Sequence, residues 1–188
     1  MATEPHPQLI VSDVTAWRAW LDTNEHLSDG VWLVLAKKGT TEPTSLSYQQ
    51  SLDEALCSGW IDGQKKSLDA ATFMQRYTPR RKRSMWSLRN TGIVEELIAQ
   101  GRMRERGMAE IELAKADGRW ERAYAGSATI EVPPALETAL AVSPAAAAAF
   151  EALSRAERFS ALHPLTSAAN ETVLTQRLAK LLTKLEAQ

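Results

Sequence analysis

The chain has 188 residues, of which 44% are hydrophobic, and its formal net charge at pH 7 is −1. This is enough apolar material for a real core, and too little positive charge for a protein that coats nucleic acid broadly. The single cysteine, Cys57, excludes an internal disulfide and a thiolate metal cluster. No window reaches the roughly 18 apolar residues of a membrane span, and the N-terminus lacks the pattern of a signal peptide. We therefore expect a cytoplasmic protein without membrane insertion.

The first half of the chain predicts both helices and strands. Apolar residues recur at i, i+3 and i+7 over residues 14–21, which predicts a helix. The apolar run at 31–36 is typical of a strand that is buried on both faces. A capping-box pattern opens a second helix at 47–58, and strands are predicted at 60–62 and 72–78.

The spacing of apolar residues in the second half of the chain predicts mostly helices. One helix is predicted from residue 87 or 90 to residue 100, and another over 108–117. The leucine stripe at 174–185 predicts a last amphipathic helix, which we expect to dock on the first domain, with a protein partner as the alternative.

A change in composition marks the predicted domain boundary. The stretch 126–134 combines glycine, small residues and a pair of prolines, and everything beyond it reads as helix. The sequence therefore predicts an α+β fold, with a small mixed β-sheet and flanking helices at 1–126, followed by an all-helical C-terminal module at 127–188.

Positive charge is concentrated in one part of the chain. Residues 76–106 contain nine basic and three acidic side chains, a net charge of +6, which leaves −7 for the remainder. A local cationic region on a nearly neutral protein favours a small anionic ligand or a limited anionic surface, and we do not expect nucleic acid as a partner.

The cationic run at 80–83 is the strongest candidate for an anion site. Ser84, Ser87 and Asn90 follow it, and a predicted helix begins just beyond, where free backbone N–H groups favour anions. The planar fork of an arginine binds phosphate and carboxylate in the same way. A solvated loop is the alternative, because most charge runs are exposed.

Two tryptophans and an aspartate flank this run. Trp60 and Trp86 are either core residues or the walls of a ligand site, because both are predicted at the edges of elements beside polar groups. Asp62 is predicted to hold an arginine in place, either Arg76 or Arg80, with a simple inter-strand ion pair as the alternative.

The sequence offers few candidates for covalent catalysis or metal binding. Cys57 lies on the apolar side of its predicted helix, which favours a buried and inert thiol. His6, His26 and His163 are far apart in the sequence, and no acidic spacing resembles a metal loop. We assign no catalytic residue, metal or cofactor.

Several motifs recur in the order known from one family. The motifs are Trp17-x-x-Trp-Leu, Val31-Trp-Leu-Val with Lys37-Lys38, Ala55-Leu-Cys-x-Gly-Trp-Ile-Asp-Gly63, Tyr77-Thr-Pro-Arg-Arg81, Ser84-x-Trp-Ser87 with Asn90, Gly101-Arg-Met103, and Gly118-Arg-Trp with Ala123-Tyr124. Together they resemble the YdeI/OmpD-associated family, which is labelled for bacteriocin protection.

The resemblance implies a role in tolerance of envelope stress or of antimicrobial peptides. It implies no settled molecular activity. One departure lies in the last helix, where Val173 replaces the first arginine of the family's Glu-Thr-Arg motif and Arg177 remains nearby.

The prediction is a non-enzymatic protein that binds a small ligand carrying phosphate or carboxylate, with an aromatic group as an option. One alternative is an enzyme that acts on a phosphorylated or sugar substrate through Asp62 and the arginines. Another is a protein-interaction module in the C-terminal helices. The sequence gives neither the ligand's identity nor the oligomeric state. The predicted ligand-binding residues are Lys37, Trp60, Asp62, Arg76, Arg80, Arg81, Ser84, Trp86, Ser87 and Asn90.

Overall fold

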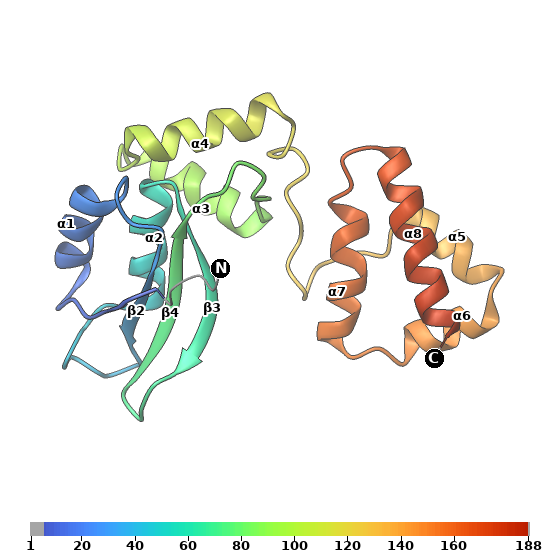
Figure 1. Ribbon diagram of the computed structural model, residues 1–188, viewed down its shortest axis with the longest axis horizontal. Helices are drawn as coiled ribbons and strands as arrows, with labels where there is room; N and C mark the ends of the chain where they lie inside the picture. The colour runs from blue at the N-terminus through green and yellow to red at the C-terminus, as the bar shows by residue number, and fades with distance from the viewer. Residues whose placement is uncertain (1–5, 188) are drawn as a thin grey trace. The chain divides into compact units, whose positions relative to one another are not determined.

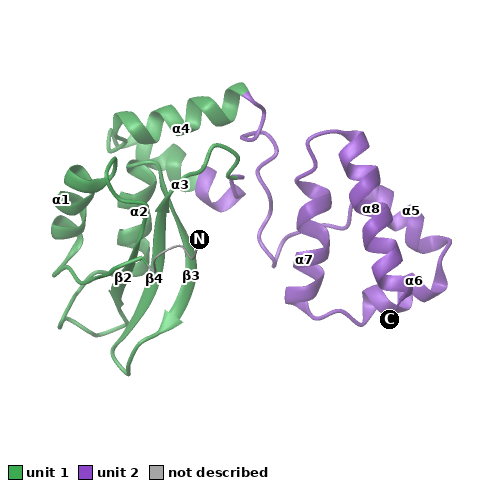
Figure 2. Ribbon diagram, viewed as in Figure 1, with its two compact units in different colours: residues 1–84, 92–116 green, residues 85–91, 117–188 purple. Residues whose placement is uncertain are grey.

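A computed structural model describes residues 6–187, which divide into two compact units (Figure 2). The first unit contains the chain up to residue 84 together with 92–116, and the second contains 85–91 and 117–188. The last change between the units falls after residue 116, whereas the predicted boundary lies after residue 126. The α+β prediction is confirmed, because one four-stranded sheet is accompanied by helices and followed by helices alone (Figure 1).

The elements follow in the order that Figure 1 labels. They are β1 (Gln8–Leu9), α1 (Val14–Asn24), β2 (Val31–Ala36), α2 (Tyr48–Cys57), β3 (Trp60–Ser67), β4 (Thr72–Pro79), α3 (Leu88–Ala99), α4 (Glu105–Ala116), α5 (Pro134–Ala141), α6 (Pro144–Glu151), α7 (Arg155–Thr166) and α8 (Glu171–Glu186).

The sheet of the first unit is mixed and has the strand order β1-β2-β4-β3. β1 runs parallel to β2, and the other neighbours are antiparallel. The three predicted strands are confirmed, but β3 continues through the polar residues up to Ser67. Pairing with β4 supplies the backbone hydrogen bonds there, and the Lys66 ammonium lies 4.0 Å from the centre of the Trp32 ring. The two-residue strand β1 was not predicted, since two residues show no alternation.

An aromatic cluster forms the core between the helices and the sheet. Asp13 caps α1, because its side chain accepts a hydrogen bond from the Ala16 N–H. Trp17 and Trp20 of this helix stack with ring centres 5.3 Å apart, and Trp17 also lies 5.7 Å from Tyr77 of β4. The Tyr77 hydroxyl bonds with that of Ser51 at 2.7 Å, so the buried polar atoms of this core are also paired.

The junction between α2 and α4 leaves no room for a side chain at Gly107. The backbone N–H of Arg104 donates to the carbonyl of Cys57 at 3.1 Å, which brings the start of α4 against the end of α2. A Cβ atom added to Gly107 would lie 2.2 Å from the same Cys57 oxygen. The close packing of these two helices therefore depends on glycine at this position.

Beside this junction lies a buried ion-pair network that the sequence did not reveal. Glu54, which is 4% exposed, pairs with Arg102 at 2.7 Å and with Arg104 at 3.2 Å. Arg104 also pairs with Asp22 at 2.9 Å and donates to the Ser58 hydroxyl at 2.6 Å. The Glu54 hydrogen bond raises the pKa of Arg102. The network joins three segments of the first unit, which are the end of α1, the end of α2 and the start of α4.

The second unit has its own hydrophobic core, made by α5 to α8. Ser143 caps α6, and Ser154 caps α7, where a capping box with Glu157 is complete. The leucine stripe at 174–185 packs within this core, so the prediction that it docks on the first domain is wrong. Four helices in one module can bury each other's apolar faces, and no outside surface is required. The buried core residues are Leu136, Ala146, Phe150, Leu162, Leu165 and Leu185.

The second unit is expected to lose stability in mildly acidic solution because of His163. Its ring lies edge-on to Tyr124 at 4.4 Å, and burial, followed by the nearby Arg177, lowers its pKa. As the pH falls below the ordinary histidine pKa of about 6.5, the unfolded chain gains a proton before the folded chain does. Unfolding followed by circular dichroism between about pH 7.5 and pH 5.5 should show this loss. His163→Phe keeps a ring but cannot titrate, and should flatten the pH dependence; an unchanged slope contradicts the assignment.

Candidate functional site

A small polar pocket lies where β3 and β4 meet the loop that follows them. Its volume is about 250 Å³, and all of its lining belongs to the first unit. Arg76 and Thr78 share a face of β4 because they are two residues apart in a strand. Gly63 reaches the pocket from β3, next to the irregularity in pairing between Asp62 and Lys65. The lining residues are Gly63, Arg76, Thr78, Pro79, Arg81 and Ser84.

A tight turn positions the two loop residues of the pocket. The N–H of Arg81 donates to the Ser84 hydroxyl oxygen at 3.0 Å, and the N–H of Ser84 donates to the Arg81 carbonyl at 2.8 Å. Pro79 ends β4 and restricts the backbone before the turn. The turn thus holds a cationic side chain and a hydroxyl at one edge of the pocket.

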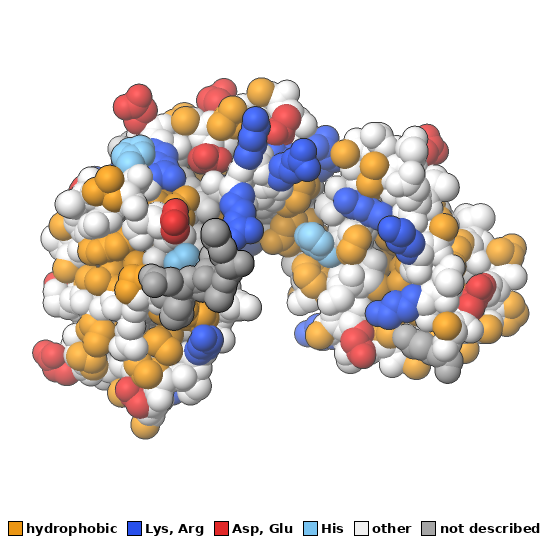
Figure 3. Space-filling model, viewed as in Figure 1, with side chains coloured by type: hydrophobic (Ala, Val, Ile, Leu, Met, Phe, Trp, Pro, Cys, Tyr) orange, Lys and Arg blue, Asp and Glu red, His pale blue; other side chains and the backbone are white. Residues whose placement is uncertain are grey.

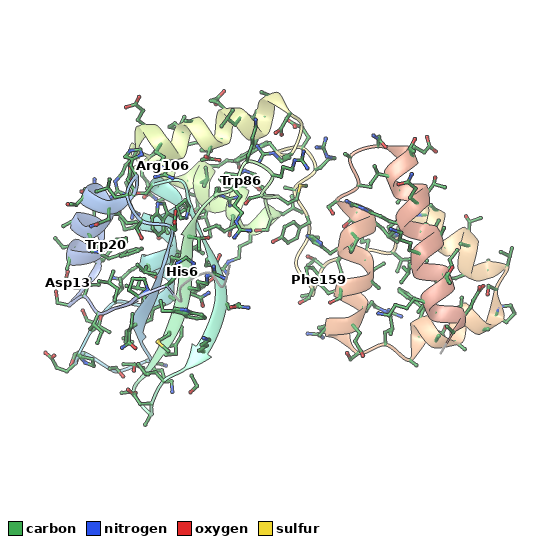
Figure 4. The ribbon with its side chains drawn as sticks, in the orientation of Figure 1. His6, Asp13, Trp20, Trp86, Arg106 and Phe159 are labelled. Atoms are coloured by element: carbon green, nitrogen blue, oxygen red, sulfur yellow. The ribbon has the colours of Figure 1, made fainter. Side chains whose placement is uncertain are left out.

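The Arg76 guanidinium is held in place by a hydrogen bond to a histidine. Its Nη2 donates to Nε2 of His6 at 2.7 Å, and Figure 4 shows His6 beside the strands. The Nε atom of Arg76 is buried and has no hydrogen-bond partner within residues 6–187. A buried donor without a partner is costly, and an anion in the pocket is a natural acceptor for it.

Trp60 and Trp86 are core residues, one of the two alternatives that the sequence left open, and neither lines the pocket. Trp60 is fully buried, its indole N–H donates to the Glu25 carbonyl at 3.3 Å, and its ring meets that of Trp20 edge-on. Trp86 is 1% exposed and lies 5.0 Å from Trp120. Both indoles are surrounded by core residues, so neither offers a face to a ligand.

Asp62 has a different partner from the one predicted. Its carboxylate accepts a hydrogen bond from the Tyr48 hydroxyl at 2.8 Å. Across the described residues no arginine forms an ion pair with it, so the predicted role of holding Arg76 or Arg80 is not supported. Asp62 pairs with Tyr77 in the sheet but does not line the pocket.

Lys37 and Arg80 lie apart from the pocket lining. Lys37 follows the end of β2 that pairs with Thr72, at the opposite end of β4 from Pro79, and its ammonium donates to the Asp69 carbonyl at 2.6 Å. Arg80 is 5% exposed, and its backbone N–H donates to the Gly59 carbonyl at 3.0 Å. Of the predicted cations, the pocket lining therefore brings together Arg76 and Arg81.

Ser87 and Asn90 form the start of α3, as the sequence indicated. The Asn90 N–H donates to the Ser87 hydroxyl oxygen at 3.2 Å, and Asn90 is 7% exposed. Both residues belong to the segment 85–91 of the second unit, whereas all the residues that line the pocket belong to the first unit. Their hydrogen bond is the ordinary one of a helix N-terminus.

Sequence reasoning missed His6, Gly63 and Thr78. Thr78 had a usable signal, because a strand at 72–78 places it on the same face as Arg76. No sequence signal pointed to His6, because its partner Arg76 lies 70 residues away in the chain. Gly63 was noted only as part of a motif, and its place in the pocket depends on the pairing register of β3.

The described residues offer few candidates for a reactive cysteine, a metal site or a membrane-spanning helix. Cys57 is buried, as predicted, and burial, with a smaller contribution from Glu54, raises the pKa of its thiol to about 11. Among residues 6–187, no group of three or more His, Cys, Asp or Glu side chains is placed to hold a metal ion. None of the described helices combines the length and apolar character needed to cross a membrane.

The fold and pocket define a small α+β domain with an arginine-lined polar site, followed in the chain by a helical module. Residues 9–110 match the family model described as a domain of unknown function (DUF8412). This match covers more than half of the chain, and the chain therefore belongs to that family.

The C-terminal module has a match of its own. Residues 129–188 match the family model described as "Bacteriocin-protection, YdeI or OmpD-Associated" (OmdA). The predicted resemblance is thus confirmed for this part, whereas most of the motifs that suggested it lie within 9–110. Comparison with the curated proteins and with the solved structures gave no match.

Proposed function

We propose that the first unit binds a small oxyanion, phosphate or carboxylate, in the pocket of Arg76, Arg81 and Ser84. The observation that carries the proposal is the meeting of two guanidinium groups and two hydroxyl side chains around one cavity, with no carboxylate in its lining. The buried Nε of Arg76 adds a donor that has no acceptor among residues 6–187. Such donors match the oxygens of phosphate and carboxylate.

The size of the pocket limits the ligand. Sites for drug-sized molecules have volumes of about 300–1,000 Å³, and this pocket of about 250 Å³ lies below that range. With Trp60 and Trp86 both buried, no aromatic platform supports an added base or ring. The proposal is therefore an inorganic anion or the anionic end of a larger molecule.

The C-terminal match supports a biological setting for this binding. The family at 129–188 carries bacteriocin protection in its description, and we propose that this chain contributes to tolerance of bacteriocins or related peptides. We further propose that it does so from the cytoplasm. Binding is favoured over catalysis because Asp62, the residue on which the enzyme alternative depended, does not line the pocket.

Arg81→Ala is expected to weaken phosphate binding about tenfold, since a hydrogen bond to a charged group contributes about 1.5–3 kcal/mol. Arg83→Ala is the matched control, because Arg83 is an exposed cation of the same loop outside the pocket lining. Isothermal titration with inorganic phosphate measures both affinities. Ligand-induced thermal stabilisation should fall in parallel, while the melting temperature without phosphate stays unchanged.

Two outcomes contradict the proposal. If phosphate does not bind at millimolar concentration, or if both variants lose affinity equally, the pocket is not the site. The second result would mean that the loop attracts anions only through its overall charge, an effect that salt screens at the surface.

A further inference from the structure

A groove in the second unit combines an apolar floor with a row of cations. It lies between α7 and α8 and has a volume of about 460 Å³. Its floor includes Leu165 and Leu185, which belong to the core of the module. Arg177, Lys180 and Lys184 of α8 also line it. Figure 3 shows Lys and Arg side chains gathered on the face that α7 and α8 form.

The three cations form a continuous stripe on α8. Their positions are i, i+3 and i+7, which lie on one side of a helix and span about 10 Å of its axis. Arg177 donates to the Pro164 carbonyl near the end of α7. Lys180 and Lys184 form no ion pair within the described part of the chain. Lys180 and Lys184 thus stand beside an apolar surface without an ion-pair partner among residues 6–187, although Glu157 lies near enough to Lys184 for its charge to be felt.

The single carboxylate of the groove does not neutralise this stripe. Glu157 accepts a hydrogen bond from the Ser154 N–H at 2.9 Å as part of the capping box of α7. The Ser154 hydrogen bonds, with a smaller contribution from Lys184, keep the pKa of Glu157 below its ordinary value. The lining therefore carries three cations against one carboxylate that is already engaged.

We propose that this groove binds a small anionic amphiphile, with a carboxylate or phosphate head group and a single alkyl tail. The tail would lie on the leucine floor and the head within reach of the α8 cations. The volume falls inside the range of small-molecule sites. A stable protein interface needs about 20–30 residues a side, whereas twelve residues line this groove. A small ligand therefore fits better than a partner helix.

The test is isothermal titration of the whole chain with octanoate and with octyl phosphate, both below their micelle-forming concentrations. The titrations use Arg81→Ala as background, so that binding at the proposed anion pocket of the first unit is weakened. Both compounds should bind at one site. Acetate, which has a head without a tail, and octanol, which has a tail without a charge, should bind at least about tenfold more weakly.

Charge reversal then tests the position of the head group. Lys180→Glu should weaken octanoate binding about tenfold. Arg155→Glu makes the same change in net charge on an exposed residue of the same module outside the groove, and should leave affinity unchanged. Ala156→Trp, at an exposed position of α7 that lines the groove, should abolish binding without changing the melting temperature.

Several results would overturn the proposal. One is equal affinity for octanol and octanoate, and another is a Lys180→Glu variant that binds octanoate normally. Binding only to anionic vesicles, or only to an acidic helical peptide, would identify a different occupant. A dimer in sedimentation equilibrium that Lys180→Glu dissociates would show that a second copy of the chain covers the groove.

Discussion

Gly107→Ala should destabilise the first unit by about 2–3 kcal/mol, the upper part of the range of about 1–3 kcal/mol that is typical of overpacking in a core. In an ordinary helix the same change stabilises by about 1 kcal/mol. Here the new Cβ would lie 2.2 Å from the Cys57 carbonyl oxygen, which is backbone and cannot rotate away. α4 must then move off α2 and disturb the hydrogen bond from Arg104 to that carbonyl. Urea unfolding followed by circular dichroism measures the loss.

The chain offers a matched control for this prediction. Gly92 also lies in a helix of the first unit, in α3, and nothing is within 4 Å of an added Cβ. Gly92→Ala should therefore leave stability unchanged or raise it by up to about 1 kcal/mol. Equal stability of the two variants would show that α4 does not depend on close contact with Cys57.

Glu54→Gln should cost about 3 kcal/mol, although the glutamine keeps the shape of the side chain. The Arg104 side chain is only 13% exposed and pairs with the Glu54 carboxylate. The substitution therefore removes one carboxylate partner from a largely buried guanidinium group. Asp22 still pairs with Arg104, and Arg102 is partly exposed, so the loss should not exceed this value. Chemical denaturation of the two proteins gives the difference in free energy of unfolding.

An exposed pair provides the comparison for Glu54. Glu112 and Lys115 are 64% and 45% exposed at their side chains and lie three residues apart on α4. Glu112→Gln should change stability by less than about 0.5 kcal/mol, as is usual for surface ion pairs. If Glu54→Gln also changed the free energy of unfolding by less than about 0.5 kcal/mol, the buried network would not stabilise the contact between α2 and the start of α4.

Local features of the fold could be predicted from the sequence because their causes are local. The predicted capping box of α2 depends on Ser47 and Gln50, which are three positions apart, and it is present. The strand at 31–36 was predicted from its composition alone. The length of β3 was not, because its polar second half is held by pairing with β4.

The candidate site could be predicted only in part, because its contacts are long-range. The segment that carries Arg76, Arg81 and Ser84 was singled out by its charge, and these residues line one pocket. Lys37 was included, but antiparallel pairing of β2 with β4 places it at the other end of the sheet. A tryptophan beside polar residues in the sequence can still be buried, as Trp60 is, when distant segments cover it.

The central claim, that the pocket of the first unit binds an oxyanion, is tested most directly by a phosphate titration of the ¹⁵N-labelled whole chain. The account predicts saturable shifts of the amide signals of Gly63, Arg81 and Ser84, with the Nε–H signal of Arg76 moving in parallel. Shifts confined to Ser87 and Asn90 would instead place the anion at the start of α3. Small, non-saturating shifts at cations throughout the chain would contradict the claim.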